Sequence, residues 1–406
     1  MRHYLLALCL TFLPSAAMAQ STIYSQLEHG RYVVATANCR TCHTAHEGEP
    51  FAGGRAMHTP FGTIYTPNIT FDEKTGLGLW TKDEFHRALH EGIARDGSRL
   101  YPAFPYPHFT KMPREDVDAV YDYLASQPRI VKSKPDNDLW FPLGWRRLVA
   151  GWNMMFFRKG VYTPDPAQSS EWNRGAYLVQ GPGHCAGCHT EKNLAGADKD
   201  SRALMGGALE NWAAPNIRGG RNGGLENWSK EEIVAFLKTG RNAHTAAMTR
   251  MGEVITYSTQ HMTLDDLGAI ATYLKSLDSQ ARPTVTLPAS EVMRAGGAIY
   301  NDNCSACHVS NGSGVPNIFA RLAGSNKLND PDPTTVIRIV LEGARATPTA
   351  TRPTAFSMPA FHWKLTDEQI ASVISFVRAS WGNKGAPVTA GEVSRMREDL
   401  QQRQDG

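Results

Sequence analysis

Apolar residues recur at helical spacing along most of this chain, in an arrangement that is repeated three times. In the first repeat the last helix is predicted over residues 114–126, with Val117, Val120 and Leu124 on one face. Helices of the same type are predicted to start at Thr263 and Thr366. Strict alternation of apolar and polar residues, which would indicate strands, is scarce. The pattern therefore predicts an all-α fold.

Each repeat is predicted to open with a helix and to contain a second helix in its middle. The opening helices are expected at residues 25–38, 171–180 and 291–303, and each carries a glycine near an aromatic residue. Such a glycine lets two helices approach closely. Capping boxes that begin at Thr81 and Ser229 mark the start of the middle helix in the first two repeats. The third is expected near residues 333–342.

The repeats define the expected division of the chain. The limits are 1–19 for a signal peptide, 24–128, 169–278 and 290–381 for three domains, 129–168 and 279–289 for linkers, and 382–406 for a polar tail. The first 19 residues combine a basic start, an apolar run and small residues before a cleavage point. That run is shorter than the roughly 20 residues that cross a bilayer, so we expect cleavage after export.

Six of the seven cysteines form three Cys-x-x-Cys-His motifs, and Cys9 lies in the signal segment. The motifs are Cys39, Cys42 and His43; Cys185, Cys188 and His189; and Cys304, Cys307 and His308. Two thiols at this spacing can each add to a vinyl group of haem, and the adjacent histidine then reaches the iron. We expect three covalently bound haem c groups with these histidines as proximal ligands. Zinc sites would need further ligand pairs, and a thioredoxin-like dithiol would need a βαβ context.

The charge balance adds one exclusion. The formal net charge is +3, and it becomes +2 when Arg2 leaves with the signal peptide. Because each haem brings two propionates, the loaded protein would be near neutral or acidic. Nothing in this balance indicates a nucleic-acid partner.

The sixth ligand of each iron is expected in the segment before the last helix of its repeat. Met358, which is followed by a proline, is the candidate in the third repeat. In the second repeat Met251 is favoured over Met248. A methionine thioether closes the iron to other ligands and raises its reduction potential.

The first repeat departs from this pattern. Phe104 stands where the spacing of the second repeat would place a methionine. His108 is the favoured distal ligand, Met112 is the alternative, and an open site is the third option. Ligation by two imidazoles would lower the potential of this haem relative to the methionine-ligated pair.

The long linker between the first two repeats is rich in proline and aromatic residues, notably at 140–143 and 151–157. It is either a strap packed across the domains or an exposed apolar contact site for a partner subunit, the membrane or a quinone. The sequence leaves both options open.

With these motifs, the sequence resembles the three-haem cytochrome c subunits of periplasmic, membrane-associated dehydrogenases of the alcohol, gluconate, fructose and aldehyde type. Related subunits serve molybdenum hydroxylases such as nicotinate or isoquinoline dehydrogenases. The resemblance is carried by residues 59–70, 100–106, 171–179, 251–277 and 358–361. The family often has methionine at the position of Phe104.

The resemblance implies an electron-transfer subunit with no substrate chemistry of its own. A catalytic dehydrogenase subunit of flavin, quinone or molybdenum type would supply electrons, and ubiquinone or a terminal oxidase would accept them. The protein would lie in the periplasm, in peripheral contact with the inner membrane. Two alternatives remain: a haem peroxidase or reductase with an open first site, and a stand-alone soluble carrier.

Overall fold

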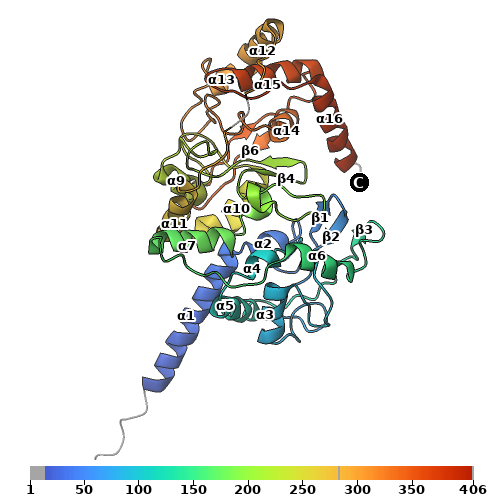
Figure 1. The fold of residues 1–406 in the computed structure, drawn as a ribbon, viewed down its shortest axis with the longest axis vertical. Coiled ribbons are helices and arrows are strands. Elements are labelled where there is room, and N and C mark those ends of the chain that lie inside the picture. Colours follow the sequence, from blue (N-terminus) through green and yellow to red (C-terminus); the bar gives the residue numbers. More distant parts are fainter. Residues whose placement is uncertain (1–13, 282–283, 405–406) are drawn as a thin grey trace, which may run out of the picture.

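The computed structural model describes residues 14–281 and 284–404, with the backbone alone for 14–23 and 403–404. Of the predicted signal peptide, residues 1–13 lie outside the described residues and residues 14–19 are described by their backbone alone. The three repeats form three mainly helical domains that follow one another along the long axis of the molecule (Figure 1). The predicted all-α fold is confirmed, with short sheets added to it.

The first domain and the linker that follows it contain six helices and three short strands. They are α1 (Pro14–Thr36), α2 (Cys39–Cys42), β1 (Ala56–Thr59), β2 (Gly62–Tyr65), α3 (Lys82–Glu91), α4 (Tyr106–Phe109), α5 (Arg114–Ala125), β3 (Asp138–Leu139) and α6 (Leu148–Phe156). The linker strand β3 pairs antiparallel with β2. The linker therefore begins as part of the first domain's sheet.

The second and third domains repeat this order with local differences. The second contains α7 (Ser170–Gln180), α8 (Ala186–His189), η1 (Asp200–Arg202), β4 (Gly207–Leu209), β5 (Trp212–Ala214), α9 (Lys230–Thr239), α10 (Thr249–Tyr257), η2 (Thr259–His261) and α11 (Leu264–Lys275). The third contains α12 (Ser290–Asn303), α13 (Ser305–His308), α14 (Thr334–Glu342), β6 (Ala344–Arg345), β7 (Ser357–Met358), α15 (Asp367–Ala379) and the terminal α16 (Ala390–Gln404). None of the described helices is long and apolar enough to cross a membrane.

The first and last helices of each domain cross at a glycine. A Cβ at Gly30 would lie 2.1 Å from the Ala119 carbonyl oxygen, and one at Gly175 would lie 1.9 Å from that of Ala269. In the third domain the crossing residue is Gly296, where a Cβ would lie 2.2 Å from a carbonyl oxygen of α15. The crossings α1–α5, α7–α11 and α12–α15 place the apolar faces of each domain inward.

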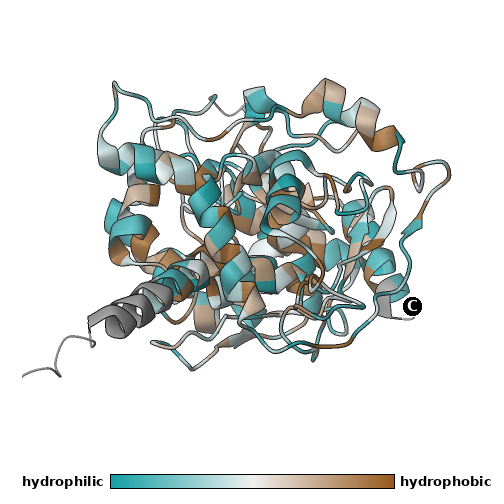
Figure 2. Ribbon diagram, turned by 90° about the horizontal axis from the view of Figure 1, so that it is seen from below, coloured by the Kyte–Doolittle hydropathy of each residue, from teal (hydrophilic) through white to brown (hydrophobic). Residues whose placement is uncertain are grey.

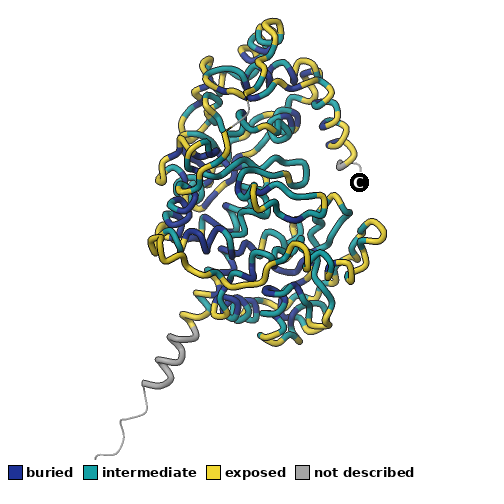
Figure 3. Tube along the Cα trace, in the orientation of Figure 1, coloured by how far each residue is buried: buried dark blue, intermediate teal, exposed yellow. Residues whose placement is uncertain are grey.

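The first two middle helices begin as predicted. Thr81 and Ser229 form complete capping boxes, and α15 begins with a third one at Thr366. Helices α3 and α9 stop at Gly92 and Gly240, whose φ angles of 63° and 73° lie in the left-handed region that suits glycine. Hydrophobic segments gather among the packed helices (Figure 2), and exposed segments follow the outer loops (Figure 3).

The first two domains are joined by a reciprocal exchange of hydrogen bonds. The Tyr32 hydroxyl of the first domain donates to Asp266 of the second at 2.6 Å. In return, the Tyr177 hydroxyl of the second domain donates to Asp116 of the first. Both tyrosines stand two residues after a crossing glycine, and both aspartates are the third residue of the last helix. The two domains therefore contact each other through equivalent residues.

The third domain is attached differently. Ala298 and Gln369 occupy the positions that hold tyrosine and aspartate in the other two domains. Instead, the segment before β7 lies against the second domain, where the Thr347 amide donates to the Ala247 carbonyl at 3.0 Å. The Arg338 guanidinium stacks 4.0 Å above the Trp212 ring.

Candidate haem sites

The three candidate proximal histidines are held in the same way. Each stands at or just after the end of a one-turn helix formed by its cysteine motif. Nδ1 lies 2.8 Å from the Pro67 carbonyl in His43, 2.7 Å from the Pro215 carbonyl in His189, and 2.8 Å from a carbonyl in His308. A carbonyl can only accept, so Nδ1 carries the proton and Nε2 keeps a free lone pair. This is the tautomer that an iron ligand requires.

In the third domain the acceptor is Ala320, and the Pro-Asn-Ile sequence common to all three repeats does not fill this role there. In the first two domains the acceptor is the proline of that sequence. In the third domain, residues 316–318 of the same sequence are exposed. The shared tripeptide therefore marks the acceptor in only two of the three repeats.

The pKa values of the paired thiols argue against thiol redox chemistry. Burial raises the pKa of Cys39 and of Cys185 to about 12 and that of Cys304 to about 11. A catalytic dithiol would instead hold one thiol well below its ordinary pKa. Burial also lowers the pKa of His43, which keeps its imidazole neutral. The donor set and the apolar clusters beside Cys39, Cys185 and Cys304 fit a haem c group in each domain.

The distal segments of the first two domains align through their backbone pairing. The residue after the stop glycine forms an antiparallel bridge with Arg99 in the first domain and with Ala246 in the second. Phe104 and Met251 each stand five residues after the bridge residue of their domain. The alignment supports Met251 over Met248, which pairs with Ala346 of the third domain.

The position of Met251 differs from the expected loop. Met251 lies within α10, a helix that comes between the bridge and α11. In the third domain Met358 lies in β7 and itself forms the bridge to Ala344. Both methionine side chains are half-buried.

In the first domain the structure places aromatic residues where a distal ligand was expected. Phe104 packs on the domain core and lies 5.6 Å from the Phe109 ring. His108 lies in α4, with its Nε2 3.2 Å from a carboxylate oxygen of Asp198. That aspartate belongs to the second domain, where it also contacts Lys192. His108 is therefore part of the contact between the first two domains.

Met112, the alternative ligand, has a counterpart in each of the other domains. Met112, Met262 and Leu365 all precede the residue before a last helix, and each is buried in the core of its domain. Met112 and Met262 share a further feature, because a side chain of the middle helix interacts with the carbonyl of each. His90 of α3 contacts the Met112 carbonyl, and Lys238 of α9 donates to the Met262 carbonyl. The equivalence favours packing as the role of Met112.

A group of charged residues that sequence reasoning missed lies beside two of the attachment motifs. Arg55 of the first domain pairs with Glu253 of the second at 2.9 Å, and Arg250 contacts both Glu253 and Glu210. Arg55 also donates to the Thr41 carbonyl, next to Cys42, at 2.6 Å. No motif signals this group, because its members come from distant parts of the sequence.

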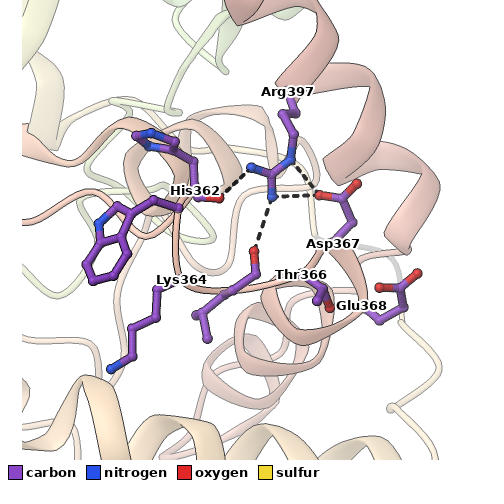
Figure 4. A pocket seen from close by; sticks show the side chains of 8 residues that line it. His362, Lys364, Thr366, Asp367, Glu368 and Arg397 are labelled. Carbon is purple, nitrogen blue, oxygen red and sulfur yellow. Dashed lines mark hydrogen bonds and ion pairs between the residues drawn. The ribbon is translucent and has the colours of Figure 1, made fainter.

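A surface pocket in the third domain lies where α16 contacts the start of α15. In Figure 4 the Arg397 side chain of α16 reaches the start of α15. It donates to the His362 carbonyl at 2.8 Å and pairs with Asp367 at 2.8 Å. These contacts hold the terminal helix on the domain.

Comparison with known proteins places the chain in a family. The Cytochrome c family profile matches residues 27–128, 173–278 and 293–381. The chain is 38% identical to the gluconate 2-dehydrogenase cytochrome c subunit of Pantoea cypripedii, over 98% of this chain and 96% of that one. It is 39% identical to the cytochrome c subunit of alcohol dehydrogenase (quinone) of Gluconacetobacter polyoxogenes, over 97% and 89%. It is 33% identical to the fructose dehydrogenase cytochrome subunit of Gluconobacter japonicus, over 95% and 85%. The chain, with three haem c domains, therefore belongs to the family of dehydrogenase cytochrome c subunits.

Proposed function

We propose that this protein relays electrons from a catalytic dehydrogenase subunit, through its three haem c groups, to ubiquinone or a terminal oxidase. The observation that carries the proposal is the threefold repetition of one arrangement: a pair of thiols beside a histidine whose Nδ1 donates to a backbone carbonyl. Haem c supplies one-electron redox chemistry when bound. The names of the gluconate and alcohol dehydrogenase relatives support a catalytic partner.

The chain's own residues would anchor and orient each haem. Cys39 and Cys42, and their counterparts in the other repeats, would form the thioether links, with His43, His189 and His308 as proximal ligands. Met251 and Met358 are the proposed distal ligands in the second and third domains. The tautomer fixed at each histidine keeps Nε2 available, and the apolar surroundings limit access of water.

The distal side of the first site is a choice between His108 and an open iron. Ligation through Nε2 of His108 would require that atom to leave Asp198, from which it lies 3.2 Å away. An open site would favour the competing function of a haem enzyme that binds a small molecule. Carbon monoxide added to the reduced, native protein distinguishes the two. Rapid binding by one haem in three would contradict a pure relay.

The relay is tested by reconstitution. The holoprotein is mixed with a candidate catalytic subunit, its substrate and a soluble ubiquinone, and haem reduction is followed by absorbance. Reduction of all three haems, followed by reoxidation with the quinone, is expected. A pyridine haemochrome assay should give three haems per chain. If no dehydrogenase subunit co-purifies with the chain and no candidate subunit reduces its haems, the stand-alone carrier is favoured.

The location is proposed to be the periplasm, with peripheral contact to the inner membrane. The linker around α6 supports this contact, because it exposes a cluster of large apolar side chains. They are Trp140, Phe141, Trp145, Leu148, Met154, Met155, Phe156 and Val161. Residues 139–164 carry four basic side chains and no acidic one. Exposed tryptophans beside arginines favour the interface of an anionic bilayer.

The linker is held firmly enough to present this surface. Val149 is buried, the Trp152 indole donates to the Ala195 carbonyl at 2.9 Å, and Arg146 donates to the Arg99 carbonyl at 2.9 Å. Sedimentation with phosphatidylglycerol vesicles tests the proposal. Binding should fall in a Phe141→Ser, Met154→Ser variant and stay unchanged in Leu264→Ser, whose exposed leucine begins α11 of the second domain. Equal binding by all three proteins would rule this surface out.

A further inference from the structure

The turn between β4 and β5 carries a glutamate where the three domains meet. Glu210 and Asn211 have φ angles of 49° and 60°, as both central residues of a tight hairpin turn of type I′ do. Arg338 of the third domain donates to the Glu210 carbonyl oxygen at 3.2 Å. The Glu210 side chain is only 7% exposed and contacts Arg250. The turn therefore points a carboxylate into the interior.

From Glu210 a chain of alternating charges reaches the first attachment motif. Arg250 lies between Glu210 and Glu253, and Glu253 in turn accepts two hydrogen bonds from Arg55, at 2.9 and 3.1 Å. Arg55 ends the chain at the Thr41 carbonyl, within the motif. We call these four residues, Glu210, Arg250, Glu253 and Arg55, the charge chain.

The charge chain is close to two attachment motifs. Glu210 follows β4, which packs on the second motif, where a Cβ at Gly207 would lie 2.6 Å from the Cys188 carbonyl oxygen. The Arg55 end of the charge chain reaches the first motif at the Thr41 carbonyl, next to Cys42. Helix α10, which carries Arg250 and Glu253, packs against α2. All four members of the charge chain belong to the first two domains.

A carboxylate is costly in this position. Burial raises the pKa of Glu210 even though Arg55, His58 and the His58 amide act in the opposite direction. An isolated carboxylate would be strongly disfavoured, and Arg250 is the cation in contact with it. An apolar residue could fill the same space without this cost, so packing alone gives no reason for a glutamate.

We propose that Glu210 sets the reduction potentials of the first and second haems together. A fixed negative charge in a poorly solvated interface stabilises the oxidised state of a nearby redox group relative to its reduced state. Because Glu210 lies near Cys42 and Cys188, its carboxylate lowers both potentials. Glu253 lies on α10, which packs against α2 of the first motif, so its charge acts mainly on the first haem. This inference rests on the proposed function, since it requires haem at those sites.

The two glutamates give different predicted patterns. In Glu210→Gln we expect the reduction potentials of the first and second haems to rise. Each electron-binding equilibrium constant should increase on the order of tenfold, which corresponds to about 59 mV. In Glu253→Gln we expect only the reduction potential of the first haem to rise. The third potential should stay unchanged in both. Glu342→Gln is the matched control, because Glu342 pairs with Arg338 at 2.7 Å but belongs to the third domain.

The experiment is a spectroelectrochemical titration of the full-length holoprotein at a fixed pH of 8. The step of the third haem is identified by its displacement in Met358→Ala. Equal shifts of all three steps, or unchanged steps in Glu210→Gln, would overturn the proposal, because they leave the glutamate a structural role only. A haem count below three per wild-type chain would instead contradict the proposed function. If Glu210→Gln does not fold, Glu253→Gln still tests the proposal. A shift in the potentials of both the first and second haems, or of neither, would refute the placement of the charge chain beside these haems.

Discussion

Replacement of Tyr177 by phenylalanine measures how firmly the first two domains are joined. Tyr177 is 7% exposed, and its hydroxyl donates to Asp116, which is also 7% exposed. A hydrogen bond to a charged group contributes about 1.5–3 kcal/mol. Buried Asp116 cannot replace the lost donor with bulk water and keeps only His29, at 2.7 Å. We therefore expect Tyr177→Phe to lower the free energy of opening this contact by about 3 kcal/mol.

The reciprocal variant should cost less. Tyr32 is half-buried, and its acceptor Asp266 retains two hydrogen bonds from Arg174, both at 2.7 Å. The carboxylate therefore stays paired when the Tyr32 hydroxyl is removed. We expect Tyr32→Phe to lower the free energy of opening by about 1.5 kcal/mol, the lower end of the same range.

Native-state hydrogen exchange, read by mass spectrometry on the holoprotein, separates this contact from global stability. Amides of α5 and α7 should exchange faster in Tyr177→Phe, and less so in Tyr32→Phe. Tyr121→Phe is the matched control, because its hydroxyl donates to the Trp80 carbonyl at 2.6 Å within the first domain. If α7 exchanges no faster in Tyr177→Phe than in this control, the reciprocal contact does not join the domains.

Four further outcomes are expected. Gly175→Ala should destabilise the second domain strongly, because the new Cβ would lie 1.9 Å from the Ala269 carbonyl oxygen; thermal unfolding checks this. Burial alone would raise the pKa of Asp266, but hydrogen bonds from an arginine and a tyrosine lower it. The Asp266 carboxylate therefore stabilises the fold above about pH 4, and this stabilisation is lost as the pH falls through the lowered pKa of the folded state. Asp266→Asn should remove that acid-dependent part from a stability–pH curve. Met358→Ala should abolish one methionine–iron charge-transfer absorption, and an unchanged spectrum would exclude that ligand. His108→Ala should convert one haem to a high-spin form in electron paramagnetic resonance if His108 is a ligand, whereas unchanged spin states would favour the open site.

Most of the helical framework could be predicted from the sequence, because its determinants are local. The capping boxes at Thr81 and Ser229 fix helix starts through residues only three apart in the sequence. A single glycine fixes the end of each of these helices. The spacing of the cysteine motifs likewise indicates haem attachment without any tertiary information. The short hairpins were missed, since their strands of two to four residues are too brief to show alternation.

The rest depends on contacts between distant segments. Asp198 lies 90 residues after His108, so nothing near His108 in the sequence indicates its ion pair. The backbone carbonyl of Ala320 holds His308, and a carbonyl carries no residue signature. The repeated Pro-Asn-Ile sequence supplies the acceptor in two domains and does not in the third.

The reciprocal tyrosine–aspartate exchange also affects how the chain assembles. Three similar domains on one chain risk pairing in the wrong combination while they fold. The contact between the first two requires a tyrosine and an aspartate from each side, and the third domain offers Ala298 and Gln369 instead. A wrong pairing would leave a buried carboxylate without its tyrosine partner, a cost that the correct pairing avoids. The same two positions thus select which domain becomes the neighbour of the first.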